Sequence, residues 1–279
     1  MAGFSDALPR WLPRRRRARR APSLLGSRGP GSFYRKLKSL QLAATRDRAA
    51  ILAFLAARYP MELGLADRLR FLRRLVETTN AVRCYHSQAE ILAVIDAVFR
   101  LGGRAGLTLV EAGSGKGAST AKLSLAAARA GGRLLVFDSF RGLPPNDESH
   151  TRLDGSAVSF RAGAFAGRLP SVQRTVARFG ALEVCQFYKG WFAETMSGFR
   201  QPIDVALLDV DLLASTRTCL QRLFPLVRPG GVVFTQDGHL RAIVELLASE
   251  RFWRDVVGVE PPVIEGLGQR KMLAIRPRA

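Results

Sequence analysis

Short apolar runs alternate with longer amphipathic stretches through most of this chain. An apolar run of about four to eight residues is typical of a buried strand, whereas apolar residues spaced three and four apart predict a helix. The pattern predicts strands over residues 107–110, 134–137, 182–187, 203–209, 231–235, 256–259 and 272–275. Between them it predicts helices over residues 88–101, 119–129, 171–179 and 215–226, and one more helix that ends at Ser249.

This alternation of strands and helices predicts an α/β fold with a doubly wound, mostly parallel sheet. The last two strands are joined by the short connection PPVIEGLGQRK and should form an antiparallel hairpin at one edge. The long connection over residues 139–169 has no strong pattern. Because loops of that length inside a compact domain are usually functional, we expect it to enclose a ligand.

The chain before residue 85 has a different organisation. Residues 33–58 and 65–78 read as helices, and Ser87 with Glu90 forms a capping box that opens the next one. We therefore divide the chain into a basic tail over residues 1–31 that should be disordered, a helical extension or lid over residues 32–84, and the main domain over residues 85–279.

Composition narrows the class of protein. The chain has 279 residues, 47% of them hydrophobic, with no apolar run of the ~18 residues that a membrane span requires. The three cysteines are scattered without metal-binding spacing, which favours a reducing compartment. We expect a cytoplasmic protein without a membrane span.

The net charge of +20 is uneven, because residues 1–48 alone carry +11. This segment has the composition of a solvated tail, of an organelle transit peptide or of an arm that binds a polyanion. The chain lacks an aromatic-interleaved basic surface, so nucleic-acid binding is a secondary hypothesis.

Candidate chemistry begins between the first two strands of the main domain. The first strand leads to Glu111, a turn with Gly113, Gly115 and Gly117 follows, and the second strand delivers Asp138. Open α/β sheets bind ligands at the carboxyl ends of their strands. This stretch therefore predicts a nucleotide-type cofactor site, although a tight strand-to-helix turn without a ligand would share the pattern.

Three cofactor classes can be compared at this turn. A P-loop fails, because Gly115-Lys116 is followed by Gly117 instead of Ser or Thr. A dinucleotide fingerprint survives formally, so an NAD(P)-dependent oxidoreductase stays an alternative. However, Glu111 would repel a pyrophosphate, whereas S-adenosylmethionine has no phosphate and carries a sulfonium and an ammonium. We therefore favour S-adenosylmethionine, with Asp138 binding its ribose hydroxyls. The predicted cofactor-binding residues are Glu111, Gly113, Ser114, Gly115, Gly117, Ser119, Asp138, Ser139 and Trp191.

A second group of polar residues follows two later strands. Asp209 and Asp211 end the strand over 203–209, and Gln236 and Asp237 end the strand over 231–235. Oxygen ligands of this kind suit a hard divalent cation such as Mg²⁺, so Asp209, Gln236 and Asp237 are predicted metal ligands. As alternatives, Asp209 would cap the next helix and Asp237 would pair with an arginine. His239, just beyond, is a general base, a substrate contact or a first-turn helix residue.

At this point the chain resembles a known family. The motifs VEAGSGKGAST, FDSFRGLP, KGWFAET, LDVDLLAST and PGGVVFTQDG, in this order, resemble the macrocin/mycinamicin (TylF/MycF-type) O-methyltransferases. The resemblance spans roughly residues 85–276. It implies a Rossmann-like class I methyltransferase fold with a seven-stranded sheet, methyl transfer to a sugar or similar hydroxyl, and a Mg²⁺ site. The family's metal ligands fall on Asp209, Gln236 and Asp237, where Gln236 replaces the first Asp of a family Asp-Asp pair.

These observations combine into one hypothesis. The chain is interpreted as an S-adenosylmethionine-dependent O-methyltransferase that acts on a hydroxylated small molecule of secondary metabolism. Asp209 or His239 serves as the catalytic base, and Mg²⁺ assists. The alternatives are a nucleic-acid-associated protein or RNA methyltransferase that uses residues 10–48 as an arm, and an NAD(P)-dependent oxidoreductase. The sequence leaves the oligomeric state open, with a homo-oligomer as one option.

Overall fold

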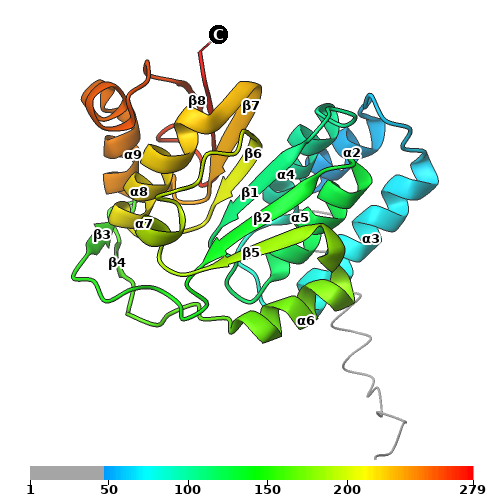
Figure 1. Ribbon diagram of the computed structural model, residues 1–279, viewed down its shortest axis with the longest axis horizontal. Coiled ribbons are helices and arrows are strands. Elements are labelled where there is room, and N and C mark those ends of the chain that lie inside the picture. Colours follow the sequence, from blue (N-terminus) through cyan, green and yellow to red (C-terminus); the bar gives the residue numbers. More distant parts are fainter. Residues whose placement is uncertain (1–46, 279) are drawn as a thin grey trace, which may run out of the picture.

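A seven-stranded sheet forms the centre of the molecule in the computed structural model, which describes residues 47–278 (Figure 1). Its strand order is β5-β2-β1-β6-β7-β9-β8. The first five strands in this order pair in parallel, whereas β9 is antiparallel to both β7 and β8. The strands are β1 (Thr108–Ala112), β2 (Arg133–Asp138), β5 (Cys185–Lys189), β6 (Ile203–Leu208), β7 (Val227–Thr235), β8 (Val263–Glu265) and β9 (Leu273–Arg276).

Two helical layers cover the sheet, one on each face (Figure 1). The central strands β1 and β6 are buried along their whole length, which is why they read as continuous apolar runs. One layer holds α2 (Arg48–Ala56), α3 (Leu65–Ala81), α4 (Gln88–Arg100), α5 (Ala118–Arg129) and α6 (Leu169–Phe179). The other holds α7 (Phe192–Thr195), α8 (Leu213–Leu223), α9 (Arg241–Ala248) and a π-helical segment, Phe252–Val257.

The predicted α/β class, the mostly parallel sheet and the antiparallel edge are confirmed, but the edge differs in one place. Residues 256–259 are not a strand, because Val256 and Val257 continue the π-helical segment, which ends at Gly258 with φ 79°. Trp253 is fully buried there and packs on Phe224. The apolar residues of this segment are therefore buried as part of a helix and not of a strand. The strand that pairs with β9 in the hairpin is β8, which lies after residues 256–259 and before β9.

The long connection after β2 also contains structure that the pattern did not predict. A two-stranded hairpin, β3 (Ser149–Thr151) and β4 (Ala157–Ser159), lies at the end of the sheet where β1, β2 and β6 terminate (Figure 1). The base of this connection is closed by backbone hydrogen bonds between Leu143 and both Gly163 and Ala164. The connection is therefore a closed loop that carries its own small sheet.

The N-terminal layer agrees with the sequence where it is described. Helix α3 and the capping box at Ser87 are present, with Ser87 Oγ accepting from the Glu90 amide at 3.1 Å. Helix α2 covers only the last part of the helix predicted over 33–58, and the rest of that helix, like the tail over 1–31, lies outside the described residues. No helix among residues 47–278 is long and apolar enough to span a bilayer.

A buried ionic junction holds the amino-terminal end of β6. Asp204 is fully buried and accepts hydrogen bonds from Arg104 Nη1 at 2.7 Å, the Thr108 amide at 2.8 Å and Arg228 Nη1 at 3.2 Å. Because each carboxylate oxygen has a charged or backbone donor, the cost of burying the charge is offset. This junction connects β1, β6 and β7 at the amino ends of these parallel strands.

Candidate active site

A cavity of about 710 Å³ lies at the carboxyl ends of β1, β2, β6 and β7. Most residues predicted from the sequence line it: Gly113, Ser114, Gly115, Ser119, Asp138, Ser139, Trp191, Asp209, Asp237 and His239. Three predicted residues, Glu111, Gly117 and Gln236, are not part of its wall. The topology therefore brings the glycine turn and the later acidic residues to one site, as parallel strands require.

The glycine turn is shaped by close contact with β6. Gly113 has φ 89°, and a Cβ on it would lie 2.0 Å from the carbonyl oxygen of Asp209. Only glycine fits both the backbone conformation and the space. Gly117, also left-handed, caps α5, and a Cβ there would lie 3.0 Å from Val172 of α6. Gly117 thus allows α5 and α6 to pack closely, whereas Gly113 allows the carboxyl ends of β1 and β6 to approach each other.

Asp138 joins the glycine turn to the end of β2. Its Oδ2 accepts hydrogen bonds from the amide and hydroxyl of Ser114, at 2.7 and 3.0 Å, and from the Gly115 amide at 3.3 Å. Its Oδ1 accepts from the Phe140 amide at 2.6 Å. This carboxylate fixes the shape of the glycine turn, and its binding to a ribose stays a prediction.

Glu111 lies within β1 beneath the turn. It is fully buried, and neither carboxylate oxygen has a hydrogen-bond partner among the described residues. Burial raises the pKa of Glu111 to about 8. A buried carboxyl group without partners is costly when ionised, so in this structure Glu111 favours the protonated form.

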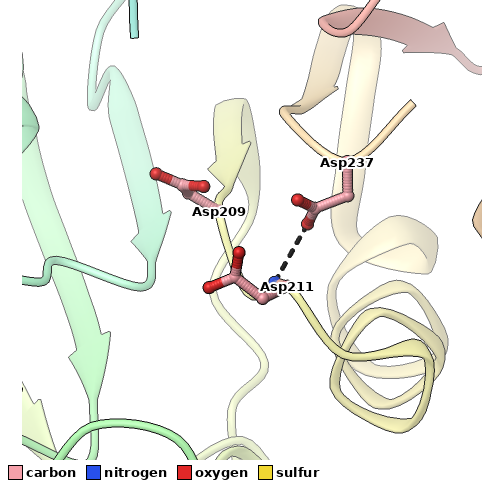
Figure 2. Close-up of side chains that lie close together, drawn as sticks. All are labelled: Asp209, Asp211 and Asp237. Carbon is pink, nitrogen blue, oxygen red and sulfur yellow. Dashed lines mark hydrogen bonds between the residues drawn. The ribbon is translucent and has the colours of Figure 1, made fainter. Parts of the chain in front are cut away.

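Three carboxylates converge on the other side of the cavity. Asp209 follows β6, Asp237 follows β7, and Asp211 lies in the loop between β6 and α8, and the three side chains lie close together (Figure 2). Their nearest oxygen atoms all lie within 4.8 Å of one another. Asp237 also accepts from the Asp211 amide at 3.1 Å, and Asp211 has φ 61°, an unusual backbone conformation outside glycine.

The charges in this cluster destabilise one another. Burial raises the pKa of all three aspartates, and the neighbouring carboxylates raise those of Asp211 and Asp237 further. Hard oxygen ligands at this separation are what a small divalent cation binds, and a cation would remove the repulsion. The residues present therefore fit such an ion.

The closed loop forms much of the remaining wall. Glu148 accepts hydrogen bonds from the amides of Leu213 and Ala214, at 2.7 and 3.0 Å, and so caps α8. The Leu153 amide donates to the His239 carbonyl at 3.0 Å. Phe165, with φ 61°, meets Tyr85 edge to face at 5.3 Å between ring centres. Of the described residues before the capping box, those of the connection 83–86 line the cavity.

A buried lysine contacts the connection 83–86. Lys122 of α5 is fully buried, donates to Thr79 Oγ1 at 2.7 Å and lies 2.8 Å from His86 Nε2. Burial lowers the pKa of Lys122 to about 8, and burial together with Lys122 lowers that of His86 well below 6.5. Because an ammonium only donates, neutral His86 accepts at Nε2 and carries its proton on Nδ1.

Comparison with known proteins agrees with this arrangement. A model of the macrocin O-methyltransferase family, TylF, matches residues 102–265, which is more than half of the chain. The chain belongs to the TylF family.

Two relatives from Streptomyces are named as O-methyltransferases. The chain is 32% identical over 169 residues to a rhamnosyl-tetracenomycin C 4'-O-methyltransferase of Streptomyces olivaceus, covering 57% of this chain and 63% of the relative. It is 35% identical over 107 residues to demethyldecarbamoylnovobiocin O-methyltransferase of Streptomyces niveus, covering 37% of this chain and 40% of the relative. These alignments span less than two thirds of either relative.

The fold comparison extends further along the chain. The structure of the O-methyltransferase NovP superposes with a TM-score of 0.56 and 22% identity, covering 85% of this chain and all of that one. At this identity the match establishes the fold alone. The chain has the class I methyltransferase fold that its TylF-like motifs imply.

The chain departs from the TylF pattern at the expected Asp-Asp pair. Gln236 is fully buried, and its Oε1 accepts a hydrogen bond from Lys271 Nζ at 3.1 Å. Lys271 also donates to the Tyr85 carbonyl at 2.9 Å and lines the cavity. The amide oxygen predicted to bind the metal is thus engaged by Lys271, and Asp211 supplies the third carboxylate of the cluster.

His239 is half-buried at the same edge, and its Nδ1 has no hydrogen-bond partner among the described residues. Burial and the nearby Lys271 lower its pKa below 6.5. The imidazole is therefore neutral near pH 7 and able to accept a proton.

Several wall residues were not predicted as site residues from the sequence. Asp211 is part of the LDVD motif. Its position two residues after Asp209 is the signal that could have placed it in the cluster. No local pattern pointed to Lys271, Tyr85 or Phe165, because each reaches the cavity only through the fold.

Proposed function

We propose that this TylF-family chain transfers the methyl group of S-adenosylmethionine to a hydroxyl of a sugar or related secondary metabolite. The observation that carries the proposal is the single cavity that joins the glycine turn to the acidic cluster of Asp209, Asp211 and Asp237. A cofactor in the turn and an acceptor at the cluster would share one cavity, so the methyl group and the hydroxyl could meet. The named activities of the two Streptomyces relatives support the same reaction type.

Each wall of the cavity has a role in this proposal. The glycine turn, held by Asp138, would receive the methionine part of the cofactor, and Ser139 and Trp191 would lie at its nucleoside end. Asp209, Asp211 and Asp237 would hold a divalent ion such as Mg²⁺. When bound, such an ion would orient acceptor hydroxyls and lower the pKa of one. Gln236 would hold Lys271 at the border of this cluster.

The acceptor proton needs a base close to the cluster. Asp209 and His239 both line the cavity, and the neutral imidazole of His239 can take a proton at pH 7. We therefore propose that Asp209 or His239 takes the proton from the acceptor hydroxyl. The cytoplasmic location stays a prediction.

Calorimetric titration with S-adenosylhomocysteine tests the cofactor assignment. We expect micromolar binding to the purified chain, with NAD⁺ as the matched negative control. Binding of NAD⁺ without binding of the homocysteine compound would contradict the proposal and make the protein an oxidoreductase. The same titration with and without Mg²⁺ would show whether the ion contributes to cofactor binding or only to the acceptor side.

A further inference from the structure

A buried polar cluster joins helix α5 to the connection 83–86. At its centre is Lys122 of α5, whose side chain is fully buried. Its ammonium donates to Thr79 Oγ1 at 2.7 Å, contacts His86 Nε2 at 2.8 Å and lies 3.9 Å from Cys84 Sγ. The three N–H bonds of the ammonium are thus matched by a hydroxyl, an imidazole and a sulfur atom.

The positive charge of Lys122 has no carboxylate partner in this cluster. Within residues 47–278, no Asp or Glu oxygen lies within 4.0 Å of the ammonium. Burial lowers the pKa of Lys122 to about 8, so the side chain is still mostly protonated near neutral pH. A buried ammonium without an anionic partner is costly, and it leaves a positive potential around the cluster. An anion bound beside the cluster would reduce that cost.

His86 connects the cluster to the cavity, because it contacts Lys122 and also lines the cavity wall. Since Nε2 accepts from the ammonium, the neutral imidazole carries its hydrogen on Nδ1. This Nδ1 has no hydrogen-bond partner within residues 47–278, yet it retains exposed surface, unlike the Nδ1 of His239. The cavity wall therefore contains one N–H donor whose tautomer is fixed by a buried cation.

The methionine part of S-adenosylmethionine carries both an ammonium and a carboxylate. The aspartates of the cavity suit the ammonium, but they repel the carboxylate. The glycine turn offers the carboxylate little, because the amides of Ser114 and Gly115 already donate to Asp138, at 2.7 and 3.3 Å. The carboxylate therefore needs a different donor, and the Nδ1–H of His86 has the required chemistry.

Two exposed cations, Arg83 and Lys116, also line the cavity. Their charges are screened by water, and their long side chains lose rotamer freedom when they bind. The imidazole of His86 is buried and already held by Lys122, so it loses little freedom on binding a carboxylate. The buried cluster is therefore the more favourable donor, and Lys116 provides a matched control.

We propose that His86 binds the carboxylate of the cofactor through its Nδ1 hydrogen, and that Lys122 is a positioning residue that fixes the tautomer and the orientation of the imidazole. This inference rests on the proposed function. It assigns the methionine end of the cofactor to the connection 83–86, beside the start of α5, and leaves the acidic cluster to the acceptor.

Two ligands that differ only in the carboxylate test the role of His86. They are S-adenosylhomocysteine and its decarboxylated analogue, S-adenosyl-3-thiopropylamine. By calorimetry, we expect the parent protein to prefer the first at least ~10-fold. In His86→Phe, which keeps a ring but has no N–H, the preference should fall to within about twofold. His86→Asn keeps an N–H close to the position of Nδ1 and should restore part of it.

The decarboxylated analogue also reports on the integrity of the cavity. Its affinity should stay within about twofold in both His86 variants, because it makes no hydrogen bond to the imidazole. If His86→Phe weakens both ligands equally, His86 has a structural role and the assignment is wrong. An undiminished preference in His86→Phe would also overturn it, although binding of S-adenosylhomocysteine would leave the proposed function intact.

Lys122→Met tests the positioning role, with Lys116→Met as the matched control. Both variants lose one positive charge, but Lys116 is exposed on the cavity wall, whereas Lys122 is buried behind it. We expect Lys122→Met to lose most of the preference in the parent protein and to cause no further loss in His86→Phe, because it acts through the imidazole. Lys116→Met should keep the preference within about twofold of the parent value.

Equal losses in the two lysine variants would show that the overall charge of the cavity binds the carboxylate, and would overturn the role of the buried cluster. A further loss of preference on adding Lys122→Met to His86→Phe would exclude action through the imidazole. If neither ligand binds the parent protein, the proposed function fails and this inference fails with it.

Discussion

At the scale of single residues, burial sets the protonation of Glu111. It is a fully buried carboxyl group without a hydrogen-bond partner among the described residues, at the point where β1 enters the glycine turn. Burial raises the pKa of this carboxyl group in the folded chain to about 8, from its ordinary value of 4.5. Between these values the folded state binds more protons, so this group lowers stability as the pH rises.

Replacing Glu111 with Gln should remove that pH dependence. At pH 8 the variant should be more stable than the parent by a few kcal/mol, and near pH 4.5 the difference should almost vanish, because both side chains are then neutral. Urea unfolding at both pH values measures the two differences. The same stability difference at both would mean that Glu111 is already ionised in the folded chain.

Asp209 is the residue that should separate catalysis from cofactor binding. Asp209→Asn keeps the shape of the side chain but removes a negative charge from the acidic cluster. We expect turnover to fall by ~100-fold or more, while the affinity for S-adenosylhomocysteine stays within a few-fold. Steady-state kinetics and calorimetry on the same preparation check this. A fully active variant would exclude Asp209 as base and as metal ligand.

At the scale of elements, the closed loop after β2 connects most parts of the site. Its Glu148 caps α8, its backbone holds His239, and its far end contacts the glycine turn, where a Cβ on Gly167 would lie 1.8 Å from the Gly115 carbonyl oxygen. The acceptor wall is therefore positioned by a segment that is far away in sequence.

Replacing Glu148 with Ala should destabilise the protein by about 1 kcal/mol, because two amides at the start of α8 lose their acceptor. Glu148→Gln is the control, since its amide oxygen keeps one acceptor and should restore part of the stability. Thermal unfolding compares the three proteins. An unchanged melting temperature in Glu148→Ala would show that solvent replaces the cap without cost.

The same loop shows where sequence interpretation reached its limit. Strands β1, β2 and β6 could be predicted because nearly all of their residues are buried, and the glycine turn because its glycines follow a strand and precede a helix. The β3–β4 hairpin could not, since its strands are only three residues long and partly exposed. Gln236 was predicted as a ligand because the sequence shows which residues end a strand. It does not show that Lys271, just before the neighbouring strand β9, donates to the amide oxygen of Gln236.

At the scale of the whole molecule, stability and function are separated along the sheet. The buried junction of Asp204 with Arg104 and Arg228 lies at the amino end of β6, and the acidic cluster lies beyond its carboxyl end. The amino end of β6 therefore holds a buried carboxylate that is paired with two arginines. The carboxyl end holds carboxylates that repel one another.

Asp204→Ala should thus reduce stability without altering the site. We expect a loss of about 3–5 kcal/mol, because two arginines and a buried amide lose their acceptor. Affinity for S-adenosylhomocysteine, measured below the unfolding transition, should stay unchanged. A variant that remains as stable as the parent would show that water replaces the carboxylate, and reduced affinity would show that the two ends are coupled.

The contact between Gly167 and the glycine turn has a kinetic consequence. A cofactor product bound in the cavity would lie against a loop that is closed at its base and joined to α8 and His239. Opening this loop breaks several backbone hydrogen bonds, whereas methyl transfer itself requires no opening. We therefore expect product departure, instead of chemistry, to set the turnover rate, so that the rate should respond to solvent viscosity and a first turnover should run ahead of the steady state.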